Sequence, residues 1–153
     1  TIPRIKDIGP DPGLISDALL GIVAQRLVRR ICPHCAVPYK PSLDELRSLN
    51  LDPKTTKTQS WRKGRGCNMC FDSGYLGREA IVELLEIDDT VREIIYDGTM
   101  TQLHRYLRKI NFASFRISAL EKVNAGVTTV EEVLRVLPHS ALHRKSIIDT
   151  LNN

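Results

Sequence analysis

The sequence lacks the features that would assign it to a membrane or secreted class. No apolar run approaches the roughly 20 residues that a membrane-spanning helix requires, and the longest candidate, residues 18–24, is too short. Residues 1–12 contain no apolar core of the kind that signal peptides have. We therefore expect neither a membrane-spanning helix nor a signal peptide in this sequence.

Motifs for phosphate binding and nucleophilic catalysis are also absent. The sequence has no GxxxxGK[ST] loop, and the glycines scattered over residues 64–77 do not open a helix as a phosphate-binding loop does. Ser118 has no accompanying pattern of His and Asp, and the acidic pair Asp88-Asp89 lies where a helix N-cap is expected. We therefore predict no catalytic and no nucleotide-binding residues in this chain.

What the sequence does contain is an average globular composition with a small basic excess. Hydrophobic residues make up 42% and charged residues 26%, which is enough apolar material for a core, and the formal net charge is +4. The densest basic cluster is Arg26, Arg29 and Arg30, which we interpret as a solvated helix end, although it could also form a local basic patch.

The four cysteines form two close pairs, Cys32-Pro33-His34-Cys35 and Cys67-Asn68-Met69-Cys70. Two CxxC pairs can complete a tetrahedral shell of four thiolates around one zinc ion, with no position left open for water or substrate. We therefore predict one structural zinc ion and a reducing, cytoplasmic compartment. Two disulfides, a rubredoxin-like iron site and competition by His34 for the metal are the alternatives.

The hydrophobic pattern predicts a mainly α chain with one β segment. Apolar residues at helical spacing predict a helix over residues 12–31, and partial alternation predicts a strand within residues 75–85. Helical patterns return after Asp88. Three capping boxes are predicted to begin helices, at the pairs Ser42 and Glu45, Thr90 and Glu93, and Thr128 and Glu131.

We therefore expect a mainly α fold with a small β-containing insert that binds zinc through the four cysteines. Four segments are predicted: residues 1–31, a helical segment; residues 32–73, the tetracysteine zinc-binding subdomain; residues 74–137, a strand followed by a helical subdomain; and residues 138–153, a tail.

Several stretches resemble the ATPases of type II secretion and type IV pilus assembly. They follow one another in the order seen in that family, and the resemblance covers roughly residues 5–137. The stretches are Ile8-Gly9 with Leu14-Ile15-Ser16-Asp17-Ala18-Leu19-Leu20-Gly21-Ile22-Val23-Ala24; Gln25-Arg26-Leu27-Val28-Arg29-Arg30-Ile31-Cys32-Pro33-His34-Cys35; Cys67-Asn68-Met69-Cys70 with Gly74-Tyr75-Leu76-Gly77-Arg78; Ile81-Val82-Glu83-Leu84-Leu85; and Glu121-Lys122-Val123 with Gly126-Val127-Thr128-Thr129-Val130-Glu131-Glu132-Val133.

The resemblance implies the C-terminal portion of a RecA-like motor without its nucleotide-binding core. Members of the family are cytoplasmic hexamers that use ATP and magnesium, and that reach the inner membrane by docking on a platform protein. The implied role is packing and contact with motor subunits or the platform protein, with no ATPase activity of this chain alone. For Arg78, in the GR element, we expect a buried or bridging structural arginine rather than a nucleotide contact.

Two other functions remain open from the sequence. The chain could be a standalone zinc-binding adaptor or regulator derived from such a motor. It could also be a nucleic-acid-binding zinc ribbon, since the chain is basic, but basic residues do not gather around the cysteines, and only Trp61, Phe71 and Tyr75 could stack on bases near them. We therefore expect no nucleic-acid partner.

Overall fold

The computed structural model describes residues 2–54, 61–110 and 112–142, without the side chains of residues 139–140. The chain divides into two compact units, each built from segments that are distant in the sequence. Within the described ranges, the first unit draws on residues 2–23 and 84–112, and the second on residues 24–83 and 113–142. The predicted division at residues 31, 73 and 137 stays a prediction.

Four helices make up most of the first unit: α1 (Ile2–Asp7), α2 (Pro12–Ala18), α4 (Asp89–Tyr96) and α5 (Met100–Lys109). Their core is aliphatic and consists of Ile2, Ile15, Leu85, Ile87, Val91, Ile95 and Leu103. Helix α2 packs on α4, and the Arg92 guanidinium of α4 donates a hydrogen bond to the carbonyl oxygen of Ser16 in α2. The unit is thus a small helical assembly around one apolar core.

The second unit mixes helices with short strands. Its elements are β2 (Ala36–Pro38), α3 (Leu43–Ser48), β3 (Arg62–Gly64), the 3₁₀ turn η1 (Asn68–Cys70), α6 (Phe115–Asn124), α7 (Val130–Val136) and α8 (His139–Leu142). Its core surrounds Trp61, which is 1% exposed and donates a hydrogen bond from Nε1 to Asn124 Oδ1 at 2.7 Å. Arg116 is also buried, and it donates to the carbonyl oxygens of Leu49 and Asn50.

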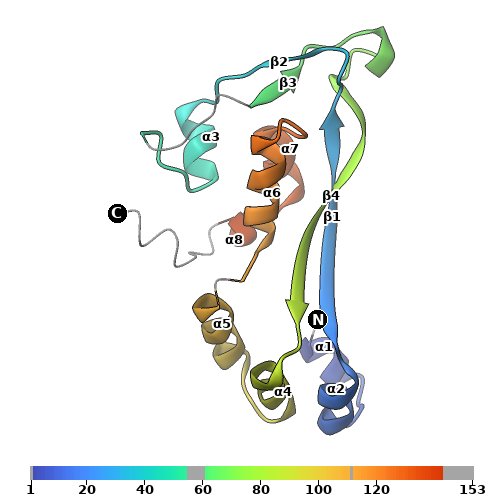
Figure 1. Cartoon of the computed structure of the whole chain (residues 1–153), viewed down its shortest axis with the longest axis vertical. Helices are drawn as coiled ribbons and strands as arrows, with labels where there is room; N and C mark the ends of the chain where they lie inside the picture. The colour runs from blue at the N-terminus through green and yellow to red at the C-terminus, as the bar shows by residue number, and fades with distance from the viewer. Residues whose placement is uncertain (1, 55–60, 111, 143–153) are drawn as a thin grey trace. The chain divides into compact units, whose positions relative to one another are not determined.

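Two long strands, β1 (Gly21–Ile31) and β4 (Tyr75–Glu86), pair in a two-stranded sheet (Figure 1). The predicted strand within residues 75–85 is confirmed by β4. The predicted helix over residues 12–31 is wrong after Ala18, because Leu19 already has extended backbone angles and the chain continues as β1. Gly21, a poor helix former, stands at this switch.

The predicted capping boxes have different outcomes. Ser42 and Glu45 form the predicted box at α3. At α4 the N-cap is Asp88, not Thr90, and its carboxylate accepts from the backbone N–H of Val91. At α7 the N-cap is Thr129, one residue after the predicted Thr128, because the Thr128 hydroxyl instead donates to the carbonyl oxygen of Arg29.

Helices predominate in the described part of the chain, and the β structure is confined to small sheets, as the sequence predicted. No helix within the described ranges is long and apolar enough to cross a membrane. The tail of residues 138–153 contributes α8, and the rest of it, from residue 143 on, lies outside the described residues.

Candidate metal centre

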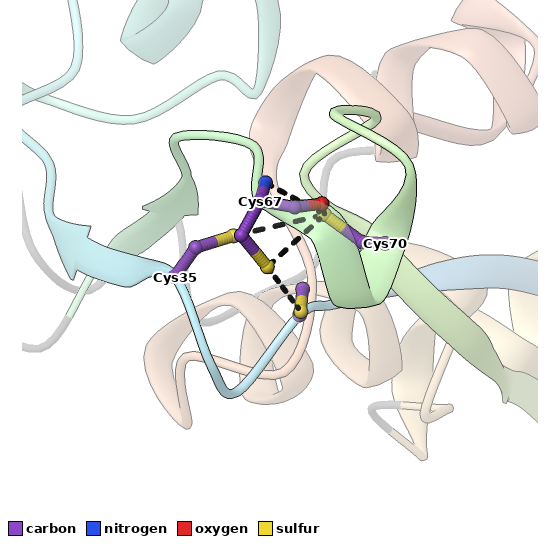
Figure 2. Close-up of side chains that lie close together, drawn as sticks. Cys35, Cys67 and Cys70 are labelled. Atoms are coloured by element: carbon purple, nitrogen blue, oxygen red, sulfur yellow. Dashed lines mark hydrogen bonds between the residues drawn. The ribbon is translucent and has the colours of Figure 1, made fainter.

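The four cysteines lie together, and their sulfur atoms are all within 4.8 Å of one another. The distances from Cys32 Sγ to Cys67 Sγ and from Cys35 Sγ to Cys70 Sγ are both 3.9 Å, and Cys67 Sγ lies 3.7 Å from Cys70 Sγ. Figure 2 shows the side chains of Cys35, Cys67 and Cys70 directed toward one another. The structure therefore brings together the four residues that the sequence singled out.

This spacing fits a tetrahedral ion. Metal–sulfur bonds of about 2.3 Å separate neighbouring sulfurs of a regular tetrahedron by roughly 3.8 Å. The three sulfur–sulfur distances given above, of 3.7 and 3.9 Å, match that edge. They are far longer than the roughly 2.05 Å of a disulfide bond, and all four cysteines are free thiols. The arrangement could hold a metal ion such as zinc or iron, and it rules out the disulfide alternative in this structure.

The first pair is held where β1 ends and β2 begins. Cys32 follows the last residue of β1, and its backbone N–H donates to the carbonyl oxygen of Gly74 at 3.0 Å. A tight turn follows, in which the N–H of Cys35 donates to the carbonyl oxygen of Cys32 at 3.3 Å. His34 sits at the tip of this turn and is exposed. It is not among the clustered ligands found in the described part of the chain.

The second pair is held by η1 and the tight loop after it. The N–H of Cys67 donates to Cys70 Sγ at 3.3 Å, and the N–H of Asp72 donates to the carbonyl oxygen of Cys67 at 3.0 Å. Phe71 and Asp72 both have positive φ angles, of 51° and 58°, which non-glycine residues seldom adopt. The chain therefore folds back on itself within one turn and directs both sulfurs to the same side.

A close approach of two glycines joins the two pairs. Strands β2 and β3 pair in antiparallel register, with Ala36 opposite Gly64. A Cβ atom on Gly64 would lie 2.0 Å from the carbonyl oxygen of Gly74, so no side chain fits at position 64. Gly74 itself has φ of 75°. Glycine at both positions lets the segment after Cys70 pass close to β3, which brings Cys67 and Cys70 to Cys32 and Cys35.

The thiols of the cluster have unequal acidities. Burial raises the pKa of Cys35 to about 11 and also raises the pKa of Cys32. Burial opposes ionisation of Cys70 as well, but backbone hydrogen bonds from Cys67 and Gly74 outweigh it and lower the pKa of that thiol to about 7. Backbone donors thus already favour the thiolate at Cys70, the form in which cysteine binds metal.

A second polar cluster, which the sequence analysis missed, surrounds Glu132. Its side chain is fully buried and accepts hydrogen bonds from the backbone N–H and the Nε of Arg29, at 2.9 and 2.8 Å, and from Nε and Nη2 of Arg135, at 2.8 and 2.6 Å. Burial opposes ionisation of Glu132, but these donors outweigh it and lower its pKa to about 2. The cluster joins β1 to α7.

Two arginine expectations are corrected here. Arg29 does not lie at a solvated helix end: it is in β1, paired with Glu132 at 2.7 Å, and its guanidinium lies 4.1 Å from the centre of the Tyr75 ring. Arg78 is exposed, so the expectation of a buried arginine is wrong. Among the residues that the structure describes, none forms a hydrogen bond or ion pair with the side chain of Arg78.

Comparisons with known proteins identify relatives over most of the chain. The family model for "Type II/IV secretion system protein" matches residues 1–135. A type IV pilus assembly ATPase, PilB, of Thermus thermophilus is 42% identical over 87% of this chain. The type II secretion system protein E of Pseudomonas aeruginosa is 42% identical over 88% of it, and the type II secretion system ATPase E of Vibrio cholerae is 37% identical over 91%.

These relatives are much longer than the chain. The matched residues span 15% of the Thermus protein, 26% of the Pseudomonas protein and 27% of the Vibrio protein. The similarity therefore concerns one region of each relative.

Proposed function

This chain belongs to the type II/IV secretion system protein family, and we propose that it forms the zinc-bearing C-terminal region of an ATP-driven motor for type IV pilus assembly or type II protein secretion. The relatives named above are ATPases or proteins of such systems, and the sequence lacks a phosphate-binding loop. In this proposal the chain does not hydrolyse ATP by itself. It works in the cytoplasm and reaches the inner membrane only through its partners.

The observation that carries the proposal is the tetrahedral spacing of the sulfurs of Cys32, Cys35, Cys67 and Cys70. We propose one zinc ion bound by all four thiolates. A closed shell of four protein ligands supplies no position for substrate, so the metal would have a structural role. It would hold the end of β1 and the loop before β4 together, and these segments are 35 residues apart in the sequence.

The proposed role of the region is packing and contact within the motor. Candidate partners are other motor subunits, as in a hexamer, and a platform protein in the inner membrane. Exposed apolar side chains near the second cysteine pair, Phe71 at 92% and Met69 at 58%, support a contact role for this end of the unit. No observation on the described residues favours a nucleic-acid-binding ribbon instead.

The direct test is metal content and ATP turnover, measured on one purified sample by elemental analysis and a phosphate-release assay. We expect about one zinc per chain and no turnover above the blank. The metal assignment would be contradicted if the purified chain contained no zinc and still bound none after refolding in the presence of zinc. Turnover that co-purifies with the protein would contradict the non-catalytic role.

A further inference from the structure

The second unit contains a cavity of about 370 Å³ that none of the four cysteines lines. Two tyrosines form part of its wall, Tyr39 directly after β2 and Tyr75 at the start of β4. Two glutamates also line it, Glu45 from α3 and Glu131 from α7. The tyrosine cavity, as we call it, is at the lower end of the roughly 300 to 1,000 Å³ of small-molecule sites, so it suits one side chain or a small ligand.

The charge of Arg29, which also lines the tyrosine cavity, is already compensated. Its guanidinium is paired with the buried Glu132 at 2.7 Å and stacks on the ring of Tyr75 at 4.1 Å. Arg135, the other partner of Glu132, does not line this cavity. The remaining cation of the wall is Lys63.

Glu45 is held in place and offsets the charge of Lys63. Its Oε2 accepts from the hydroxyl of Tyr39 and from the backbone N–H of Ser42 at 2.8 Å, and no described residue donates to its Oε1. The Lys63 ammonium lies 5.2 Å from the centre of the same tyrosine ring. Burial opposes ionisation of Glu45, but the hydrogen bonds from Tyr39 and Ser42, with a contribution from the charge of Lys63, outweigh it and lower its pKa. Glu45 therefore presents an oriented carboxylate with one free oxygen.

Glu131 differs from the other charged residues of the wall because none of the described residues forms a hydrogen bond or ion pair with its exposed side chain. It lies close to both phenols: burial raises the pKa of Tyr39 and of Tyr75, and the charge of Glu131 contributes to both shifts. The Tyr75 hydroxyl is itself fixed by a hydrogen bond with Thr129 Oγ1 at 2.8 Å. The cavity thus combines one uncompensated carboxylate with neutral hydroxyl groups.

We propose that the tyrosine cavity binds an organic cation, the guanidinium or primary ammonium group of a basic side chain or small amine. Such a group carries one positive charge, which matches Glu131, and at least three N–H donors, which match the free oxygens of Glu131, Glu45 and the phenols. Aromatic rings add attraction for a cation. An anionic ligand would instead meet Glu131 with like charge. Among the described residues, only the cysteines form a group of three or more metal-ligating side chains, so an organic cation fits this cavity better than a metal ion.

The test is titration of the isotope-labelled chain at low ionic strength, followed through the NMR shifts of its backbone amides. The ligands are N-acetylargininamide, agmatine and N-acetylcitrullinamide, in which an uncharged urea of similar shape replaces the guanidinium. We expect the arginine derivative to shift the amides of Tyr39, Gly64 and Tyr75, which belong to the cavity wall. The citrulline derivative should not shift them, because it lacks the positive charge.

Three variants locate the binding. Glu131→Gln removes the unpartnered charge, and the loss of a charge-assisted hydrogen bond should weaken binding by roughly tenfold. Glu45→Gln should also weaken it while keeping the helix start intact, because glutamine serves equally in a capping box. Glu121→Gln is the matched control: Glu121 is exposed on α6 and does not line the cavity, so the same loss of charge should leave the affinity nearly unchanged.

The two cationic ligands distinguish the sources of the group. Binding of N-acetylargininamide identifies the side chain of a protein partner as the ligand, and binding of agmatine alone identifies a small free amine; either result supports the cation site. Equal binding of the citrulline derivative, equal weakening by Glu131→Gln and Glu121→Gln, or no binding of either cation to the unaltered chain overturns the proposal.

Discussion

The two units of this chain are stabilised by different kinds of interaction. In the first unit the buried residues are almost all aliphatic, and the only buried polar side chain among those described is Ser16. In the second unit an apolar core is combined with the buried ions Glu132 and Arg116, the hydrogen bond of Trp61 to Asn124, and the four-cysteine cluster.

This difference predicts how each unit responds to damage. Apolar contacts are non-directional, so removing part of one side chain costs free energy roughly in proportion to the buried volume that is lost. Buried charges and metal ligands act as sets, because removing one member leaves its partners without compensation. Substitutions should therefore have abrupt effects in the second unit and graded effects in the first.

The largest effect should follow substitution of a cysteine. Cys35→Ser replaces one thiolate of the proposed zinc shell. Structural zinc contributes an apparent free energy of about 10 kcal/mol or more, so we expect most of the bound zinc to be lost. Hydrogen exchange measured by mass spectrometry should show loss of protection in β2, β3 and η1, while α4 and α5 remain protected.

His34→Ala is the matched control for this substitution. His34 lies in the same turn as Cys35 but is exposed and is not among the clustered ligands. The variant should keep one zinc per chain and the exchange pattern of the unaltered protein. Loss of zinc from His34→Ala would mean that histidine takes part in the shell, and unchanged zinc in Cys35→Ser would remove the case for four-cysteine ligation.

The second effect concerns Glu132. Glu132→Gln leaves Arg29 and Arg135 without their carboxylate, and we expect the unfolding free energy to fall by about 3 to 4 kcal/mol. This value is toward the lower end of the cost of breaking a buried ion pair, because both arginines still reach solvent. Urea denaturation measures the loss. Glu131→Gln, at the exposed neighbouring position, should change stability by less than about 0.5 kcal/mol. Similar effects of both variants would contradict a special role of the buried carboxylate.

The unaltered chain and Glu132→Gln also allow a test of pH dependence. The pKa of Glu132 is lowered from an ordinary 4.5 to about 2 in the folded chain. Its stabilising contribution is therefore fully present above about pH 4.5 and is lost as the pH falls from there toward 2. The stability difference between the unaltered chain and Glu132→Gln should shrink over this window. Comparison of the two proteins cancels any release of the proposed zinc ion in acid, which would affect both.

Short-range patterns in the sequence predicted the turn at each cysteine pair and several elements correctly. Each CxxC pair needs only one tight turn, and the structure forms that turn at both pairs. The alternation before Glu86 and the capping box at Ser42 are likewise local signals, and both predicted elements are present. That the two cysteine pairs meet was inferred from the chemistry of four thiolates rather than from any pattern in the residues between them.

Long-range interactions explain the failures. Ile22, Val23, Leu27 and Val28 fit a helical face, yet this segment is β1, because it pairs with β4 about fifty residues later in the chain. The Arg29 backbone also binds Glu132 and Thr128, which lie about a hundred residues away. The same contacts move the N-cap of α7 from the predicted Thr128 to Thr129, and Glu132 in the first turn is buried.

Substitutions of Ile95 test the graded response of the first unit, and their expected effect is the third in size. Ile95 in α4 is 0% exposed, and Ile95→Ala should cost about 2 to 3 kcal/mol through lost burial and a residual cavity. Ile95→Val removes a single methylene and should cost about 1 kcal/mol. Thermal and urea denaturation should show this gradation, with zinc content unchanged in both variants. Complete loss of structure in Ile95→Val would contradict a tolerant aliphatic core.

The smallest effect tests a directional contact within the first unit. Asp88 caps α4 by accepting from the N–H of Val91 at 2.9 Å, and its other oxygen accepts from the hydroxyl of Tyr106. Asp88→Ala should cost about 1 kcal/mol, the usual cost of losing an N-cap. Asp89→Ala removes the same charge from the first turn but no cap, so it should cost only a few tenths of a kcal/mol. Equal losses in the two variants would show that charge near the helix N-terminus, rather than the cap hydrogen bond, provides the stabilisation. The non-directional stabilisation of the first unit would then extend to the start of α4.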